Sequence, residues 1–347
     1  MIGLVVGLGS IGRRHARNWA RLGLGEVWIA RQHGAAQPEA LGVEARLFDR
    51  LDVALRQGPD VVIVANPTSL HVETAQQALE AGAHVLAEKP LGHSLEGVAR
   101  LLETASSHKR VLAVGYHLRF ARGLARLRDI VRGGGVGRPV SARAEAGEYL
   151  PDWHPWEDYR QSYSGRRDLG GGAVLTFSHE IDALCWVLGA PRSVQASARR
   201  ASGLEIDTED VAELLLDFPS AVGSIHVDYV RRPPRRWLEV VGEEGVVRWE
   251  YEADRVLRYA PATREWRVEE GDPRATRNDM YLAELAQFAA CVRGEVARPA
   301  VDGEQGAAVL AIALAALHAA ESGRRIDLES EGEPVGKWLN SLGRDPA

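Results

Sequence analysis

The chain has 347 residues, enough for two domains, and its shares of hydrophobic (45%) and charged (26%) residues are those of a soluble globular enzyme. Its net charge of -6 argues against a general binder of nucleic acid or of anionic membranes. Two cysteines supply neither a disulfide framework nor a thiolate metal site, no apolar run reaches membrane-spanning length, and the chain starts directly with a strand. We therefore expect a soluble, cytoplasmic protein without a bound metal.

The first element is an apolar strand over residues 2–6, followed at once by G-x-G-x-x-G and by a helix that runs to about Leu22. Gly7 allows the tight turn, Gly9 lets a pyrophosphate approach the backbone, and Gly12 lets the helix pack closely on the strand. The helix N-terminus offers amide groups to the phosphates. The predicted cofactor contacts in this turn are Gly7, Gly9, Ser10, Ile11 and Gly12.

The second strand, Val27–Ala30, ends at Arg31, roughly 20 residues past the glycines, where an NAD site usually carries an acidic residue. A guanidinium suits a 2′-phosphate because its fork matches phosphate geometry. Arg31 could instead stack on the adenine or face water. The sequence therefore favours NADP over NAD, with either cofactor possible.

Strands and helices go on alternating through the first third of the chain. Asp49 is expected to cap a short helix, Ser94 a longer one, and the strand over 61–65 leads into Asn66 and Pro67. Such alternation predicts parallel strands in a doubly wound domain. Its expected extent is residues 1–119, with a second domain over 120–347.

Lys89 follows an apolar strand over 85–87 and precedes Pro90, which cannot donate to a strand ladder. A lysine at the carboxyl end of such a strand points into the crevice where open α/β sheets bind ligands. The alternative is a solvated lysine in an ordinary loop.

Several motifs recur together in a known family. They are Gly7–Gly12 with His15, Asn66-Pro67-Thr68 with His71, Glu88-Lys89-Pro90, and Gly115-Tyr116 with Arg119-Phe120. In order and spacing they resemble the glucose–fructose oxidoreductase and inositol dehydrogenase (Gfo/Idh/MocA) family. The resemblance implies that Lys89 lies beside the nicotinamide and the reacting carbon as a catalytic residue. It also implies cofactor contacts for Asn66, Pro67, His71, Glu88 and Lys89.

The second domain is predicted to be an open, largely antiparallel sheet, because its strands alternate apolar with polar residues at period two. These strands are 140–146, 194–198, 211–218, 224–229, 237–241, 246–251 and 255–259. One face should pack on helices. The other could be wet, bind substrate or meet another subunit, and the resemblance implies a homodimer or homotetramer through it.

Residues 152–160 form a loop rich in Trp, Tyr and charged residues, and Tyr163 and Arg166 follow before a run of three glycines. Aromatic faces stack on sugar rings while charged groups bond hydroxyls, so a carbohydrate-like substrate fits. The alternative is that the tryptophans only pack on the sheet. The predicted substrate contacts of the chain are Tyr116, Trp153, Tyr163, Arg166, Thr176 and Asp182.

A helix is predicted over 173–184, with His179 and Asp182 three residues apart as a base and its orienting carboxylate. The resemblance supports both, since the family has a His-x-x-Asp helix here. Its members carry an Asp three or four residues before the histidine, where this chain has Thr176 and Leu175. A lysine–aspartate–histidine triad therefore lacks its acid, and zinc is disfavoured because no second histidine follows four residues on.

Two further segments of the second domain stand out. The basic run 231–236 is either solvated or contacts a substrate phosphate or carboxylate. A very apolar, Ala-rich helix follows Gly303 and is expected to be core.

These patterns predict an NAD(P)-dependent oxidoreductase that transfers a hydride at a hydroxyl or carbonyl of a sugar, cyclitol or sugar derivative. His179 would take the hydroxyl proton while Lys89 polarises the oxygen or relays the proton. Two alternatives remain: a cofactor-binding regulator without turnover, and a cofactor-dependent enzyme that cleaves glycosides.

Overall fold

The computed structural model describes residues 1–31, 41–328 and 334–344, which form two compact units. Among these residues, unit 1 comprises Met1–His117 and Arg277–Ala307, and unit 2 comprises Leu118–Thr276 and Ala308–Arg344. The division after residue 117 lies two residues before the predicted boundary. The return of residues 277–307 to the first unit was not predicted.

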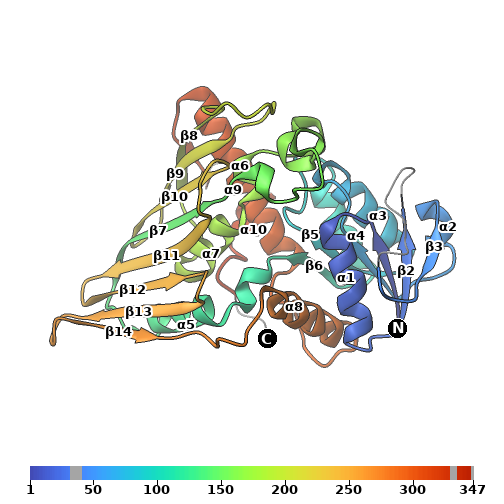
Figure 1. Cartoon of the computed structure of the whole chain (residues 1–347), viewed down its shortest axis with the longest axis horizontal. Helices are drawn as coiled ribbons and strands as arrows, with labels where there is room; N and C mark the ends of the chain where they lie inside the picture. Colours follow the sequence, from blue (N-terminus) through green and yellow to red (C-terminus); the bar gives the residue numbers. More distant parts are fainter. Residues whose placement is uncertain (32–40, 329–333, 345–347) are drawn as a thin grey trace. The chain divides into compact units, whose positions relative to one another are not determined.

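Unit 1 contains a six-stranded parallel sheet in the order β3-β2-β1-β4-β5-β6 (Figure 1). The strands are β1 (Ile2–Val6), β2 (Glu26–Ala30), β3 (Arg46–Phe48), β4 (Val61–Val64), β5 (His84–Glu88) and β6 (Leu112–Gly115). The order reverses between β1 and β4, which is the switch point where doubly wound sheets bind ligands. The predicted doubly wound fold is confirmed.

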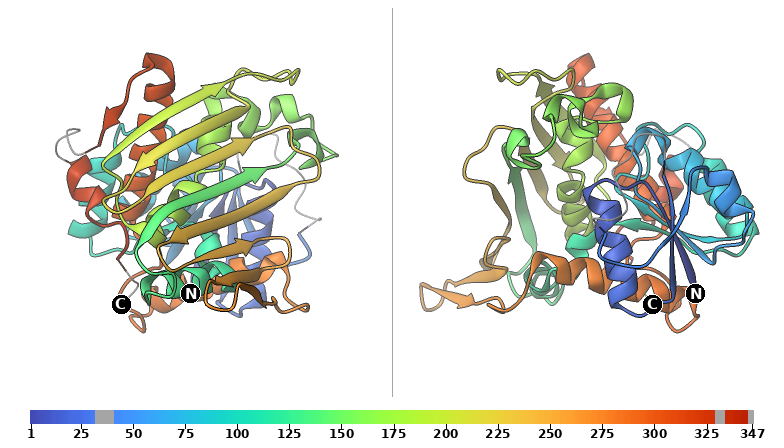
Figure 2. Two further views of the ribbon diagram at one scale, coloured as in Figure 1. Left: turned by 90° about the vertical axis from the view of Figure 1, so that its left-hand side faces the viewer. Right: turned by 45° about the vertical axis from the view of Figure 1, so that its right-hand side comes forward.

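Helices cover both faces of this sheet (Figure 2). They are α1 (Ser10–Arg21), α2 (Leu51–Leu55), α3 (His71–Glu80), α4 (Val98–Ser107) and α8 (Arg277–Val292). Trp19 of α1 lies against Gly3, where a Cβ would come within 2.5 Å of the indole ring. Leu285 and Phe288 of α8 join the same buried cluster. Residues 277–307 therefore complete the core of unit 1.

Unit 2 contains a nine-stranded sheet in the order β14-β13-β12-β11-β7-β10-β9-β8-β15. The strands are β7 (Pro139–Gly147), β8 (Ser193–Arg199), β9 (Val211–Asp217), β10 (Val222–Asp228), β11 (Arg235–Gly242), β12 (Gly245–Glu250), β13 (Arg255–Ala260), β14 (Glu265–Glu269) and β15 (Ile326–Asp327). Only β7 and β10 pair in parallel, so the prediction of a largely antiparallel sheet is confirmed.

One face of the unit 2 sheet packs on α5 (Arg122–Arg132), α6 (Ala173–Thr176) and α7 (His179–Leu188). Along β9 the residues directed to this face, Ala212, Leu214 and Leu216, are buried. The left view of Figure 2 looks onto the opposite face, which no helix among the described residues covers. The remaining helices are α9 (Gly303–Ser322) and α10 (Val335–Leu339).

Helix α9 is long and apolar enough to cross a membrane by length and composition, although the sequence was predicted to contain no such run. In the structure 72% of its most apolar window is buried inside the protein. That burial agrees with the prediction that this Ala-rich helix is part of the core.

Three predicted helix boundaries are wrong, each because a tertiary contact or another backbone conformation prevails. Helix α2 is capped by Arg50, since the Asp49 carboxylate pairs with Arg31 instead. Helix α4 begins after Gly97, whose φ of 75° marks a turn that Ser94 only precedes. The helix predicted over 173–184 is interrupted at Phe177, which packs against Tyr229.

Candidate functional site

The turn between β1 and α1 has the shape that a dinucleotide phosphate requires. Gly7 has a φ of 98°, in the left-handed region, and a Cβ there would lie 2.6 Å from the Ala65 carbonyl oxygen. A Cβ on Gly12 would collide with the Gly7 carbonyl oxygen, whereas one on Gly9 would meet nothing within 4 Å. Gly9 caps α1 without a side-chain hydrogen bond, and no acidic residue lies in the first turn that begins with Ser10. The turn therefore fits an anion at the helix N-terminus.

A cavity of about 390 Å³ lies beside this turn, at the carboxyl ends of β1, β2 and β4. Its lining includes Val6, Ala30 and Asn66 from the strand ends and Arg31 and Asp49 from the loops that follow β2 and β3. Such an edge next to a glycine-rich turn is where the adenosine half of a dinucleotide binds in doubly wound domains. Arg31, a predicted cofactor contact, lines this cavity.

His71 connects two predicted cofactor loops. Its Nδ1 lies 2.8 Å from the Pro90 carbonyl oxygen and its Nε2 lies 2.9 Å from the Asn66 carbonyl oxygen. The side chain is buried, and burial lowers the pKa of His71 in spite of both carbonyl contacts. Asn66 donates from Nδ2 to Thr74 Oγ1 at 2.9 Å. His71 therefore joins the loops at Asn66 and Lys89, and both of its ring nitrogens contact backbone carbonyl groups.

Glu88 lies at the end of β5, immediately before Lys89. Its Oε1 lies 2.7 Å from His15 Nε2, and its Oε2 accepts a hydrogen bond from the Lys89 backbone N–H at 3.3 Å. Burial alone would raise the pKa of Glu88, but the hydrogen bond and charge of His15, together with the charges of Lys89 and His71, outweigh it and hold the pKa below its ordinary value. Gly115 brings β6 close, since a Cβ there would touch the carboxylate at 3.4 Å. An ionised Glu88 therefore fixes the chain that carries half-buried Lys89.

A second carboxylic acid, Glu284 of α8, was not predicted. It is 4% exposed, and its Oε2 has no hydrogen-bond partner among the described residues. Burial, together with the charge of Glu88, raises the pKa of Glu284 well above its ordinary value and so favours the protonated form of this side chain. Tyr281 of the same helix stacks on His117 with ring centroids 4.0 Å apart. Tyr281 and Glu284 lie more than 160 residues away from His117 and Glu88 in the sequence, so no local motif indicates that they are neighbours.

In unit 2, His179 is the first residue of α7 and is buried. Thr176, the last residue of α6, is buried as well and accepts a hydrogen bond from Tyr229 Oη at 2.7 Å. Burial raises the pKa of Tyr229 well above its ordinary value, so it stays a neutral donor. Tyr229 was missed because it directly follows β10 and lies 53 residues away from Thr176 in the sequence.

The aromatic loop divides into packed and exposed parts. Trp153 meets Phe177 and Tyr229 edge-on, with centroids 5.7 and 5.5 Å away. This favours the packing alternative for Trp153. Tyr163 is half-buried, while Arg166 is exposed and paired with Asp168. Tyr116, in unit 1, is fully buried.

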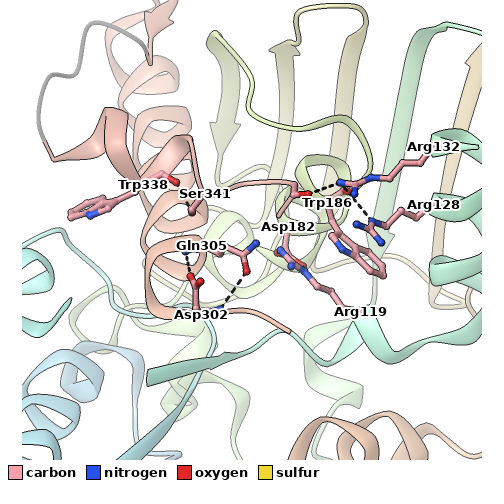
Figure 3. Close-up of polar contacts among 10 residues, drawn as sticks. Arg119, Arg128, Arg132, Asp182, Trp186, Asp302, Gln305, Trp338 and Ser341 are labelled. Atoms are coloured by element: carbon pink, nitrogen blue, oxygen red, sulfur yellow. Dashed lines mark hydrogen bonds and ion pairs between the residues drawn. The ribbon is translucent and has the colours of Figure 1, made fainter. Parts of the chain in front are cut away.

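Asp182 is engaged by Arg119, as Figure 3 shows. Arg119 donates from Nη2 to Oδ1 at 2.6 Å and from Nε to Oδ2 at 3.1 Å. The Arg119 guanidinium lies 5.5 Å from the Trp186 ring centroid, and Arg128 and Arg132 both donate to the Trp186 carbonyl oxygen. Burial, aided by the charges of Arg132 and Arg119, lowers the pKa of Arg128 to about 10. With both oxygens bound to Arg119, Asp182 anchors α7 through a buried ion pair.

The basic run 231–236 makes contacts within the protein. Arg231 pairs with Glu145 at 3.0 Å, and Arg236 pairs with the buried Glu180 at 2.7 Å. Protein carboxylates, and not only solvent, therefore balance part of this run.

Comparison with known proteins gives the same assignment for both parts of the chain. Residues 3–116 match an oxidoreductase family with an NAD-binding Rossmann fold, and residues 124–248 match the GFO/IDH/MocA C-terminal domain. The chain is 28% identical to 1,5-anhydro-D-fructose reductase of Ensifer adhaerens and 28% identical to myo-inositol 2-dehydrogenase of Thermotoga maritima. Each alignment covers 94% of this chain and 98% of the relative.

Among solved structures, the WlbA dehydrogenase from Bordetella pertussis in complex with NADH and UDP-GlcNAcA is 27% identical, with a TM-score of 0.78. The alignment covers 94% of this chain and 98% of that one. The resemblance seen in the sequence motifs is thereby confirmed across both units. The chain belongs to the GFO/IDH/MocA family of oxidoreductases.

Proposed function

We propose that the protein is a nicotinamide-dependent dehydrogenase or reductase that acts on a hydroxyl or carbonyl group of a sugar, a cyclitol or a sugar derivative. The observation that carries the proposal is the turn at Gly7–Gly12, where the N-terminus of α1 has neither a side-chain cap nor an acidic residue in its first turn and lies beside a cavity. The relatives support the substrate class, since their names specify anhydrofructose, myo-inositol and a UDP-linked sugar acid.

The cofactor would supply the hydride acceptor in oxidation and the donor in reduction. In this chain the α1 amides would hold its phosphates, and the cavity at Arg31 would hold its adenosine half. Asn66, Pro67, Glu88 and Lys89 would lie at its nicotinamide half, as the family resemblance implies. The preference for NADP that Arg31 predicts is opposed by the ion pair of Arg31 with Asp49.

For the chemistry, we assign His179 to take the proton of the substrate hydroxyl and Lys89 to stabilise the oxygen or relay the proton. Thr176 stands where the family carries an aspartate, and its hydroxyl is oriented by Tyr229 at 2.7 Å. A neutral pair of hydroxyls would bind a substrate hydroxyl but could not take its proton at neutral pH. Acid–base work therefore falls to Lys89 and His179.

A dehydrogenase screen tests this proposal, with NAD and NADP run separately over free sugars, 1,5-anhydro sugars, inositols, sialic-acid-like compounds and UDP-sugar acids. On a verified substrate, Lys89→Met and His179→Ala should each lower kcat by 100-fold or more, the range of a lost general acid or base, about 10²–10⁴. The exposed Lys109 and His318 give matched controls, Lys109→Met and His318→Ala, which should retain wild-type turnover. Wild-type turnover in both site variants would refute the assignment.

Two other outcomes would select the alternatives. Dinucleotide binding without turnover on any member of the panel would identify a regulator. Release of an aglycone without net change in the redox state of the cofactor would identify a glycoside-cleaving enzyme. Location in the cytoplasm remains a prediction from the sequence.

The uncovered face of the unit 2 sheet is our proposed subunit interface. Leu215 of β9 and Val222 of β10 are 46% and 51% exposed and point to this face, as the strand register requires. Trp266 and Val268 of β14 are exposed apolar residues at the far edge of the same sheet. Sedimentation velocity should show a dimer or tetramer that Leu215→Glu with Val222→Glu dissociates, whereas Val53→Glu in unit 1 does not. A monomer at all concentrations would refute the proposal.

A further inference from the structure

Among the residues that the structure describes, four charged side chains line the cavity at the carboxyl ends of β1 and β2, and their charges cancel. Arg31 and Asp49 come from the loops after β2 and β3, and Arg50 and Asp52 come from the start of α2. An acidic side chain at this position of a dinucleotide site bonds the ribose 2′-hydroxyl of NAD, whereas an arginine accommodates the 2′-phosphate of NADP. The cavity therefore contains the determinants of both cofactors.

The two arginines are already paired. Arg31 donates from Nε to Asp49 Oδ1 at 3.1 Å. Arg50 donates from Nε and Nη2 to the two oxygens of Asp52, each at 2.9 Å. Strand pairing brings the first pair together, since Ala30 of β2 lies opposite Phe48 of β3, one residue before each partner. The acidic group expected at the end of β2 is thus supplied by the neighbouring strand.

We infer that Asp49 determines cofactor choice at this cavity and that it favours NAD over NADP, with Arg31 acting as its partner. The inference rests on the proposed cofactor-dependent function. A 2′-phosphate would carry up to two negative charges towards Asp49, and the described residues that line the cavity carry no net positive charge to offset them. A 2′-hydroxyl brings no charge and can donate to the carboxylate.

The solvent exposure of Asp49 limits how strongly it can discriminate between NADH and NADPH. The Asp49 side chain is 71% exposed, so its repulsion of a phosphate is screened by water. The Asp49 charge alone, at about 4 Å in water, weakens binding of a singly charged group by about fivefold and of a doubly charged phosphate by about 10- to 30-fold, and this is the repulsion that Asp49→Asn removes. The Arg31–Asp49 pair itself adds little, since exposed ion pairs are weak.

The experiment measures binding alone. Purified full-length protein is titrated with NADH and with NADPH, without sugar, and the quenching of tryptophan fluorescence gives Kd. The variants are Asp49→Asn, Asp49→Asn combined with Arg31→Gln, and the control Glu103→Gln. Glu103 is an exposed acid on α4 outside the cavity lining, so its variant makes the same change in net charge.

Wild type and Glu103→Gln should bind NADH at least tenfold more tightly than NADPH. Asp49→Asn should reduce this ratio at least tenfold, mainly by tightening NADPH, and the added Arg31→Gln change should remove that gain. An unchanged ratio in Asp49→Asn, or a wild type that prefers NADPH, would overturn the inference. Binding of neither dinucleotide would overturn it together with the cofactor site, whereas lack of turnover on sugars would count only against the proposed reaction.

Discussion

Breaking the buried ion pair between Arg119 and Asp182 tests whether Asp182 anchors α7 or takes part in the chemistry. The two side chains are 2% and 1% exposed and make two hydrogen bonds. The variants are Arg119→Met, Asp182→Asn and the two combined. If Asp182 is an anchor, these variants are less stable to unfolding than the wild type, and their turnover falls only in proportion to the loss of folded protein.

The expected loss of stability follows from the burial of this ion pair. At an effective dielectric of about 20, opposite charges about 4 Å apart attract by about 4 kcal/mol, and the desolvation of both ions offsets much of this. Removing one partner leaves the other buried and uncompensated, which costs about 3–5 kcal/mol. Arg119→Met should lie near the lower end of this range, because burial raises the pKa of Asp182 and lets it take up a proton once the arginine is gone. The double variant should lose less than the sum of the single variants by about 2 kcal/mol.

Urea unfolding, followed by circular dichroism and tryptophan fluorescence, measures these changes. With m of about 2–3 kcal/mol/M, the midpoint of the single variants should fall by roughly 1–2 M. Arg138→Met is the matched control, since Arg138 pairs with Glu243 on the surface and its loss should cost under about 1 kcal/mol. A 100-fold loss of turnover in Asp182→Asn at an unchanged midpoint would refute the anchoring role. So would an Arg119→Met midpoint equal to that of the control.

Three further predictions concern single positions. Gly12→Ala should weaken NADH binding by 10-fold or more in fluorescence titration, because the added Cβ meets the Gly7 carbonyl oxygen, and wild-type affinity would contradict the assigned turn. The pKa of Glu284 is raised above 4.5 in the folded state. The stability that the buried, protonated side chain contributes is therefore full below pH 4.5 and is lost as the pH rises. Glu284→Gln should therefore raise the Tm at pH 8 but not at pH 4, and an equal change at both would count against a buried acid. Hydrogen bonds to Asp228 and Glu213 raise the pKa of His226 to about 9, so its stabilisation is full below pH 6.5 and disappears above about 9. His226→Gln should lower the Tm at pH 6 and leave it unchanged at pH 10, which thermal melts can check.

The sequence predicted most of unit 1 because its determinants are local. A buried parallel strand such as Val61–Val64 is apolar at every position, and the turn at Gly7–Gly12 requires glycine for reasons of backbone geometry alone. Most strands of unit 2 were also predicted, since burial alternates along them with period two. Strand β14 was missed although Trp266 and Val268 alternate with charged residues along it; it has five residues, all exposed, and lies at the edge of the sheet.

What escaped prediction depends on contacts between distant residues. The partners of Arg119 and Thr176 lie 63 and 53 residues away, and nothing near either residue indicates them. An aspartate is a common helix cap, yet the Asp49 carboxylate does not cap α2 and instead pairs with the guanidinium of Arg31, which follows the neighbouring strand β2. At the candidate site, the residue types were therefore predictable and their partners were not.

The return of residues 277–307 to unit 1 has a consequence for how the protein is made. Strand β6 leaves the ribosome early, but Leu285 and Phe288, which pack in the same core as Trp19, are synthesised about 170 residues later. At roughly 5–20 residues per second, the nascent first unit waits about 10–30 s for the helix that completes it. During that interval its apolar α1 face lacks the α8 side chains and is a surface on which chaperones can act. For the same reason, a fragment cut after residue 119 would lack part of its own core.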